Sequence, residues 1–166
     1  SVNGGTGLTT IIVETATHLI GIESKRFEPF RDSKTVNLSD AYDRDVWGDG
    51  MEPVTVMRDM LRSGDTAFAY LDAAQLVKHA FGLVTEGRRI GKMPVLLYLY
   101  AEPAARGTSA IKPESLAGHR AEIASFASAV AGAAVRVAAC SYREWFADWT
   151  GDARVHSDAL AARFHP

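Results

Sequence analysis

The first two apolar segments of the chain have the length and composition of β-strands. Residues 9–14 (TTIIVE) are rich in β-branched side chains, and residues 19–27 (LIGIESKRF) follow after a short turn. Two such runs around a tight turn predict a β-hairpin. Pro29 is expected to end the second strand, because proline has no N–H to donate to a neighbouring strand.

Apolar residues at helical spacing follow a long polar loop at residues 31–50. Residues 54–62 predict a short helix that Ser63-Gly64 ends, and residues 66–84 predict a longer helix. The buried stripe of the longer helix is expected to consist of Tyr70, Ala73, Ala74, Val77, Ala80, Phe81 and Val84.

The second half of the chain alternates strands with helices. Residues 93–101 (MPVLLYLYA) are almost wholly apolar, which is typical of a central strand covered on both faces. Residues 113–131 predict a helix, residues 134–139 a buried strand and residues 142–149 a closing helix. The chain, residues 1–166, is therefore expected to be one α/β domain, with a mixed central sheet that opens with a β-hairpin and carries helices on both faces.

Composition narrows the classes of function. The formal net charge is -2, so a DNA contact must come from a local basic patch and not from overall charge. The single cysteine, Cys140, cannot form a disulfide bond within the chain, which favours a reducing cytoplasm. No apolar run approaches the roughly 18 residues of a membrane span.

The triplet Glu23-Ser24-Lys25 on the second strand is the first candidate for chemistry. Side chains alternate across a strand, so Glu23 and Lys25 emerge on one face, about 7 Å apart. A carboxylate and an ammonium at this spacing can act as one Mg²⁺ ligand and one cation directed at the same phosphate. Such a triplet is also common as an exposed charge pair without a function, so the surrounding sequence has to distinguish the two interpretations.

That context resembles the PD-(D/E)XK, or restriction-endonuclease-like, nuclease superfamily. Residues 21–30 (GIESKRFEPF) resemble the second-strand block of such nucleases, and residues 71–83 (LDAAQLVKHAFGL) are similar to the helix that follows their site. The likeness touches most of residues 9–149. It implies a metal-dependent endonuclease, of restriction or repair type, that hydrolyses DNA phosphodiester bonds with Mg²⁺ or Mn²⁺. A homodimer would pair two such sites to cut both strands.

The resemblance also implies roles for individual residues. Glu23 would bind the metal, Lys25 would orient the attacking water and offset developing charge, and Gln75 would assist them. Basic residues after the site are expected to contact the nucleic-acid backbone, namely Lys78, Arg88 and Arg89. His79 has no second histidine or cysteine at ligand spacing and is assigned no metal.

One acidic ligand of such a site is missing from the expected place. In the superfamily an aspartate on the first strand supplies it. If Ala16-Thr17 is a two-residue turn, Thr10 falls opposite Glu23, and threonine is a weak ligand for Mg²⁺. Glu14 shares the face of Thr10 but lies about 13 Å nearer the turn.

Three interpretations follow from Thr10. Glu14 is a displaced metal ligand, or Thr10 is a natural or engineered loss, or the chain is an inactive homologue that serves as a nucleic-acid-binding or assembly module. A second acid beside Glu23 would favour the enzyme, and Thr10 alone there would favour the module. An N-terminal helix of the kind that often precedes the hairpin in these nucleases would lie upstream of Ser1. An unrelated α/β enzyme with an incidental Glu-Ser-Lys is the remaining alternative.

Overall fold

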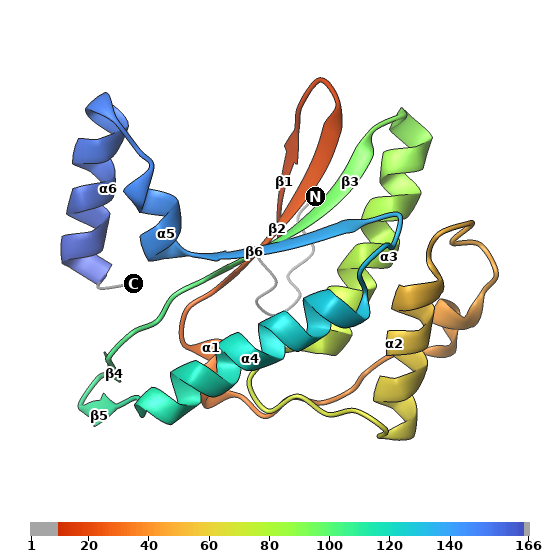
Figure 1. Cartoon of the computed structure of the whole chain (residues 1–166), viewed down its shortest axis with the longest axis horizontal. Helices are drawn as coiled ribbons and strands as arrows, with labels where there is room; N and C mark the ends of the chain where they lie inside the picture. The colour runs from red at the N-terminus through yellow and green to blue at the C-terminus, as the bar shows by residue number, and fades with distance from the viewer. Residues whose placement is uncertain (1–9, 165–166) are drawn as a thin grey trace, which may run out of the picture.

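The described part of the chain, residues 10–164 of a computed structural model, is built on a four-stranded mixed sheet of order β1-β2-β3-β6 (Figure 1). β1 (Thr10–Glu14) and β2 (His18–Lys25) form an antiparallel hairpin, while β3 (Met93–Tyr100) and β6 (Arg136–Ser141) run parallel to β2. The predicted α/β class, the mixed sheet and the opening hairpin are confirmed. Thr9, which was expected to begin the first strand, lies outside the described residues.

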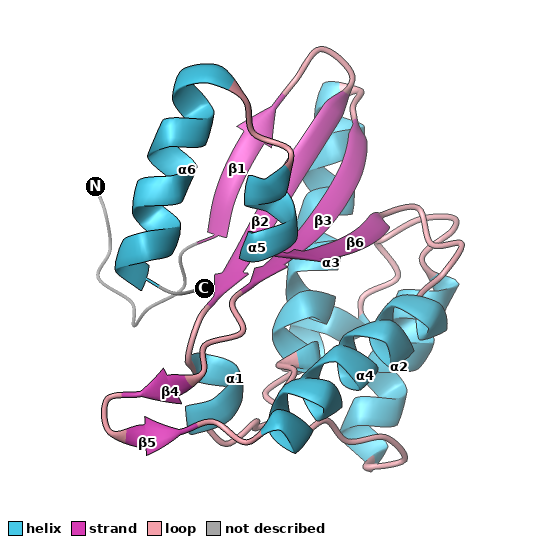
Figure 2. Cartoon of the chain, turned by 60° about the vertical axis from the view of Figure 1, so that its left-hand side comes forward, coloured by secondary structure: helices cyan, strands magenta, loops and turns pink. Residues whose placement is uncertain are grey.

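Helices lie on both faces of the sheet (Figures 1 and 2). α3 (Ala73–Ile90) and α4 (Pro113–Ala129) pack on one face, and α2 (Glu52–Ser63) packs against α3. The opposite face meets α5 (Tyr142–Ala147), where the Ser24 hydroxyl lies 2.6 Å from that of Tyr142. α6 (Gly151–Phe164) lies beside α5.

Strand β2 and helix α3 make contact at matched intervals. Lys25 contacts Gln75, Glu23 contacts His79, and Gly21 lies under Leu83. Four residues of a helix rise about 6.0 Å and two residues of a strand about 6.6 Å, so each helical turn meets the next inward-facing strand position. A Cβ at position 21 would lie 2.8 Å from Leu83 Cδ1, so glycine permits this close approach.

The predicted start of the long helix at residue 66 is wrong. The Glu122 carboxylate accepts hydrogen bonds from the backbone N–H groups of Ala69, Tyr70 and Leu71, at 2.7, 2.8 and 2.8 Å, which holds this stretch outside the helix. α3 instead begins after Asp72, whose side chain caps it. It also continues to Ile90, six residues beyond the predicted end, so Arg88 and Arg89 lie in its last turn and not in a loop.

The other predicted helices and strands are present within a few residues of their expected ends. α6 and the short elements were not predicted, apart from one helical turn allowed for within the long loop, because they carry almost no apolar periodicity; α6 buries only Ser157. The short elements are α1 (Glu28–Arg31), the 3-10 helix η1 (Asp40–Asp43), β4 (Ala105–Arg106) and β5 (Ser109–Ala110). Within residues 10–164, no helix has the length and apolarity needed to cross a membrane.

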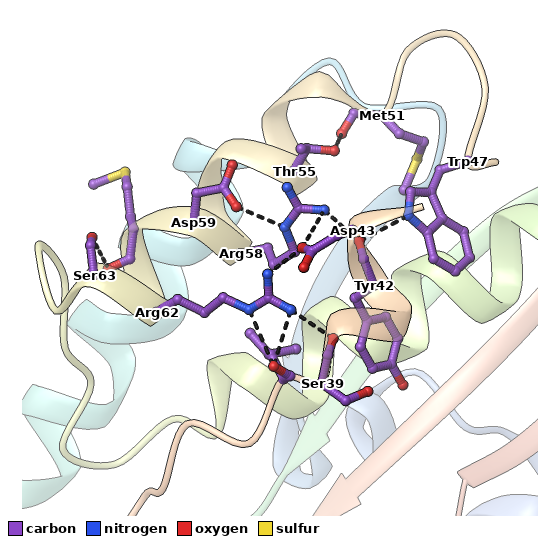
Figure 3. Close-up of polar contacts among 12 residues, drawn as sticks. Ser39, Tyr42, Asp43, Trp47, Met51, Thr55, Arg58, Asp59, Arg62 and Ser63 are labelled. Carbon is purple, nitrogen blue, oxygen red and sulfur yellow. Dashed lines mark hydrogen bonds and ion pairs between the residues drawn. The ribbon is translucent and has the colours of Figure 1, made fainter. Parts of the chain in front are cut away.

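The long polar loop between α1 and α2 is held in place by two arginines of α2 (Figure 3). Arg62 donates to the carbonyls of Leu38, at 3.0 Å, and Ser39, at 2.6 Å, and pairs with Asp43. Arg58 donates to the carbonyl of Tyr42, which also accepts from the Trp47 indole at 3.2 Å. Carbonyl–guanidinium bonds therefore hold this loop, in which η1 is the short helical element, against α2.

We expect Arg62→Ala to lower the free energy of unfolding by about 1–3 kcal/mol, because it leaves the partly buried Leu38 carbonyl without its donor and also removes the bonds to Ser39 and Asp43. Urea unfolding followed by tryptophan fluorescence would measure the change. Arg89→Ala is the control, because the Arg89–Glu86 pair is exposed and an exposed pair contributes only about 0–1 kcal/mol. Equal effects of the two substitutions would contradict a special role for Arg62.

Candidate functional site

A buried carboxylate with two basic neighbours lies at the centre of the candidate site. Glu23 is 1% exposed, and its two oxygens lie 2.6 Å from Lys25 Nζ and 3.1 Å from His79 Nδ1. Burial alone would raise the pKa of Glu23, but hydrogen bonds from His79 and Lys25, together with their charge, outweigh it and lower the pKa. Glu23 is therefore ionised at neutral pH.

Gln75, in the first turn of α3, fixes the other side of Lys25. Its Oε1 accepts a hydrogen bond from Lys25 Nζ at 3.0 Å, and its backbone N–H donates to the Asp72 side chain at 3.0 Å. Gln75 is 7% exposed, and its Nε2 is buried without a hydrogen-bond partner among the described residues. A buried amide nitrogen of this kind is costly unless something accepts its hydrogens.

A cavity of about 450 Å³ opens beside Lys25 and Gln75, between the end of β2, the start of α3 and the segment after α1. Tyr98 and Lys34 also line it. Its acidic side chains are already engaged: Glu28 accepts from the backbone N–H groups of Arg26 and Phe27, Asp32 pairs with Arg31, and Asp72 accepts from the backbone N–H of Gln75. Lys34 in turn donates to the carbonyls of Glu28 and Asp32. Lys25 is thus a cation of the wall whose contacts with Glu23 and Gln75 leave one hydrogen over.

The expected position of the second acidic ligand is occupied by Thr10. The backbone register pairs Thr10 with Glu23, as predicted, and pairs Glu14 with Leu19 near the turn. Glu14 forms an ion pair with Lys92 at that end of the sheet, away from Glu23. Among residues 10–164, no three histidine, cysteine, aspartate or glutamate side chains gather to hold a metal ion. The predicted pair of metal-binding carboxylates, Glu23 with an acid on β1, is therefore not formed by Thr10 or Glu14.

The basic residues predicted to bind nucleic acid do not join Lys25. Arg88 donates to the carbonyls of Trp47 and Asp49, and Arg89 pairs with Glu86. Both lie in the last turn of α3, about 20 Å along the helix from Gln75. Lys78 lies beside His79 and lines a separate shallow cavity.

A second buried polar pair adjoins the cavity. The Tyr98 hydroxyl, on β3, lies 3.0 Å from Nε2 of His119, on α4. Tyr98 is the register partner of Glu23, and both side chains of the pair are buried. Burial lowers the pKa of His119 to about 4, and burial, with Glu23 and other nearby acids, raises that of Tyr98, so both groups are neutral near pH 7.

His79 and Tyr98 had been given no place in the site from sequence alone. For His79 the pattern was available: it follows Gln75 by four residues, so the two share one side of the helix. Tyr98 stands in an apolar strand, and its position next to Glu23 follows only from the pairing of β2 with β3.

Among known proteins, no family model, curated protein or solved structure matches the chain.

Acid should destabilise the protein partly through His119. Because its folded-state pKa is lowered, the neutral form contributes stability that is full above pH 6.5 and is lost as the pH falls towards 4. The free energy of unfolding should fall by about 3 kcal/mol over this range, because each unit of difference between the folded and unfolded pKa corresponds to about 1.36 kcal/mol. His119→Gln should remove this part of the slope, which urea unfolding at several pH values between 7 and 4 would measure.

Substitution of an exposed histidine, His156→Gln, provides the control and should follow the wild-type slope. An unchanged pH dependence in His119→Gln would show that His119 is not buried as a neutral group.

Proposed function

We propose that this chain is a nuclease-type DNA-binding domain that holds a backbone phosphate at Lys25 but lacks the pair of acids needed to cut it. The main support is the ammonium group of Lys25. Its Nζ carries three hydrogens, of which Glu23 and Gln75 accept two, and its side chain is 13% exposed, so one hydrogen remains for a phosphate oxygen. A phosphate oxygen accepts from such a group without a metal ion.

The contacts of the acidic groups are the second support. Glu23 contacts Lys25 and His79, and the carboxylates that line the cavity already accept from backbone N–H groups or from Arg31, so a divalent cation would have to displace existing partners. Thr10 opposite Glu23 supports the loss of cleavage, since the acid that would complete a metal site is replaced by a neutral side chain. The restriction-endonuclease-like identity of the fold is part of this proposal and rests on the Glu-Ser-Lys block and the helix that carries Gln75.

Lys25→Ala should weaken DNA binding about tenfold, because a charge-assisted hydrogen bond to phosphate is lost. Fluorescence anisotropy with labelled single-stranded and duplex oligonucleotides would measure the affinity, and its dependence on salt should weaken in the variant. Gln75→Leu should act in the same direction.

Lys92→Ala provides the matched control. Lys92 is also an ion-paired, largely buried lysine, but it lies with Glu14 at the opposite end of the sheet, so its removal should leave DNA affinity unchanged. Absence of binding by the wild type, or equal losses in the Lys25 and Lys92 variants, would overturn the proposal.

A metal-dependent DNA endonuclease is the second candidate, favoured by the direct contacts among Glu23, Lys25 and Gln75. It requires a second acid beside Glu23, which neither Thr10, opposite it, nor Glu14, at the other end of the sheet, provides. A homodimer, which would place two sites on the two strands of DNA, belongs to this candidate.

Cleavage of supercoiled plasmid with Mg²⁺ or Mn²⁺ separates the two candidates. We expect no cleavage by the wild type and metal-dependent cleavage by Thr10→Asp, because the backbone register puts the new carboxylate opposite Glu23. Adding Lys25→Ala to Thr10→Asp should abolish this activity. Metal-dependent cleavage by the wild type that disappears in Lys25→Ala would instead establish the endonuclease.

A further inference from the structure

Tyr98, whose hydroxyl is hydrogen-bonded to His119, is part of the wall of the cavity that we assign to phosphate. The two side chains are 3% and 1% exposed, and Tyr98 lines the cavity together with Lys25 and Gln75. Two apolar side chains could fill the same space, because replacing both partners of a buried hydrogen bond with apolar groups is nearly neutral for stability. The polar pair therefore points to a use of the Tyr98 hydroxyl.

The direction of this hydrogen bond depends on where neutral His119 carries its single ring hydrogen. A phenol hydroxyl has one hydrogen to donate and accepts through its oxygen. With the hydrogen on Nδ1, His119 Nε2 can only accept, and Tyr98 must donate to it. With the hydrogen on Nε2, His119 donates to Tyr98, and the hydroxyl hydrogen is free for another acceptor.

We propose that Tyr98 is a further hydrogen-bond donor to the phosphate in this cavity, and that His119 is a positioning residue that frees the Tyr98 hydrogen by donating to its oxygen. The inference rests on the proposed function. An anionic ligand has only acceptors to offer, so its arrival selects the form of His119 with the hydrogen on Nε2.

The surroundings of His119 hold its ring in one orientation. The rings of Phe30 and Tyr100 meet it edge to face at centroid distances of 5.4 and 5.3 Å, and Tyr98 does so at 5.7 Å. Because the imidazole is packed on several sides, Nε2 stays directed at the Tyr98 oxygen while the hydrogen moves between the two ring nitrogens.

The test is a double-mutant cycle on DNA affinity, measured by fluorescence anisotropy with a labelled oligonucleotide. Tyr98→Phe and His119→Leu should each weaken binding about tenfold, and the double variant should bind no more weakly than either single variant. His119→Gln, whose side-chain amide can donate near the position of Nε2, should retain most of the affinity. Tyr142→Phe is the control, because it removes a hydroxyl from the opposite face of the sheet.

The outcomes separate this inference from the proposed function. If the wild type binds DNA and Lys25→Ala weakens binding while Tyr98→Phe does not, the inference fails and the proposed function stands. If the wild type binds no DNA, both fail. If the loss of DNA affinity in the double variant equals the product of the two single losses, His119 does not act through Tyr98, and its positioning role is overturned.

Histidine nitrogen NMR gives a readout that does not depend on the stability of the variants. In the wild-type protein saturated with the oligonucleotide, His119 should carry its hydrogen on Nε2. A hydrogen on Nδ1 in that complex would overturn the inference, because Tyr98 would then be donating to His119.

Discussion

The packing of α3 along β2 is the constraint on which the site depends. One turn of the helix matches two residues of the strand, so a contact at one position fixes the contacts at the next. Gly21 lets Leu83 approach the strand, and the same alignment brings His79 to Glu23 and Gln75 to Lys25. A shift of β2 by one residue would turn all of these side chains to the other face.

This packing buries the carboxylate of Glu23, and neighbouring side chains compensate for its loss of hydration. An ionised group removed from water requires partners, and Glu23 obtains them from its own strand and from α3. Lys25 is in turn held by Gln75, whose helix begins where Asp72 caps it. A continuous series of contacts, from Glu23 to Lys25 to Gln75, therefore connects the sheet with the cavity.

Local pattern was enough to predict the hairpin, the central strand and the pairing of Thr10 with Glu23, because each depends on the composition of a short run or on a short turn. It failed where a distant residue decides the backbone. Glu122 accepts from three N–H groups more than fifty positions earlier and delays the start of α3, which no spacing within residues 66–84 reveals. For the same reason Glu23, Lys25 and Gln75 could be named from sequence, whereas Tyr98 and His119 required the parallel pairing of β3 and the placement of α4.

The balance of charge decides what kind of ligand the cavity favours. A site for Mg²⁺ concentrates carboxylate oxygens, so that their mutual repulsion is relieved when the cation binds. Here the buried carboxylate already contacts an ammonium and an imidazole, and a metal ion would have to displace these partners. A phosphate requires no such displacement, because Glu23 and Gln75 accept only two of the three hydrogens of Lys25 Nζ. The same residues that identify a nuclease-type site thus favour direct binding of an anion as long as position 10 stays neutral.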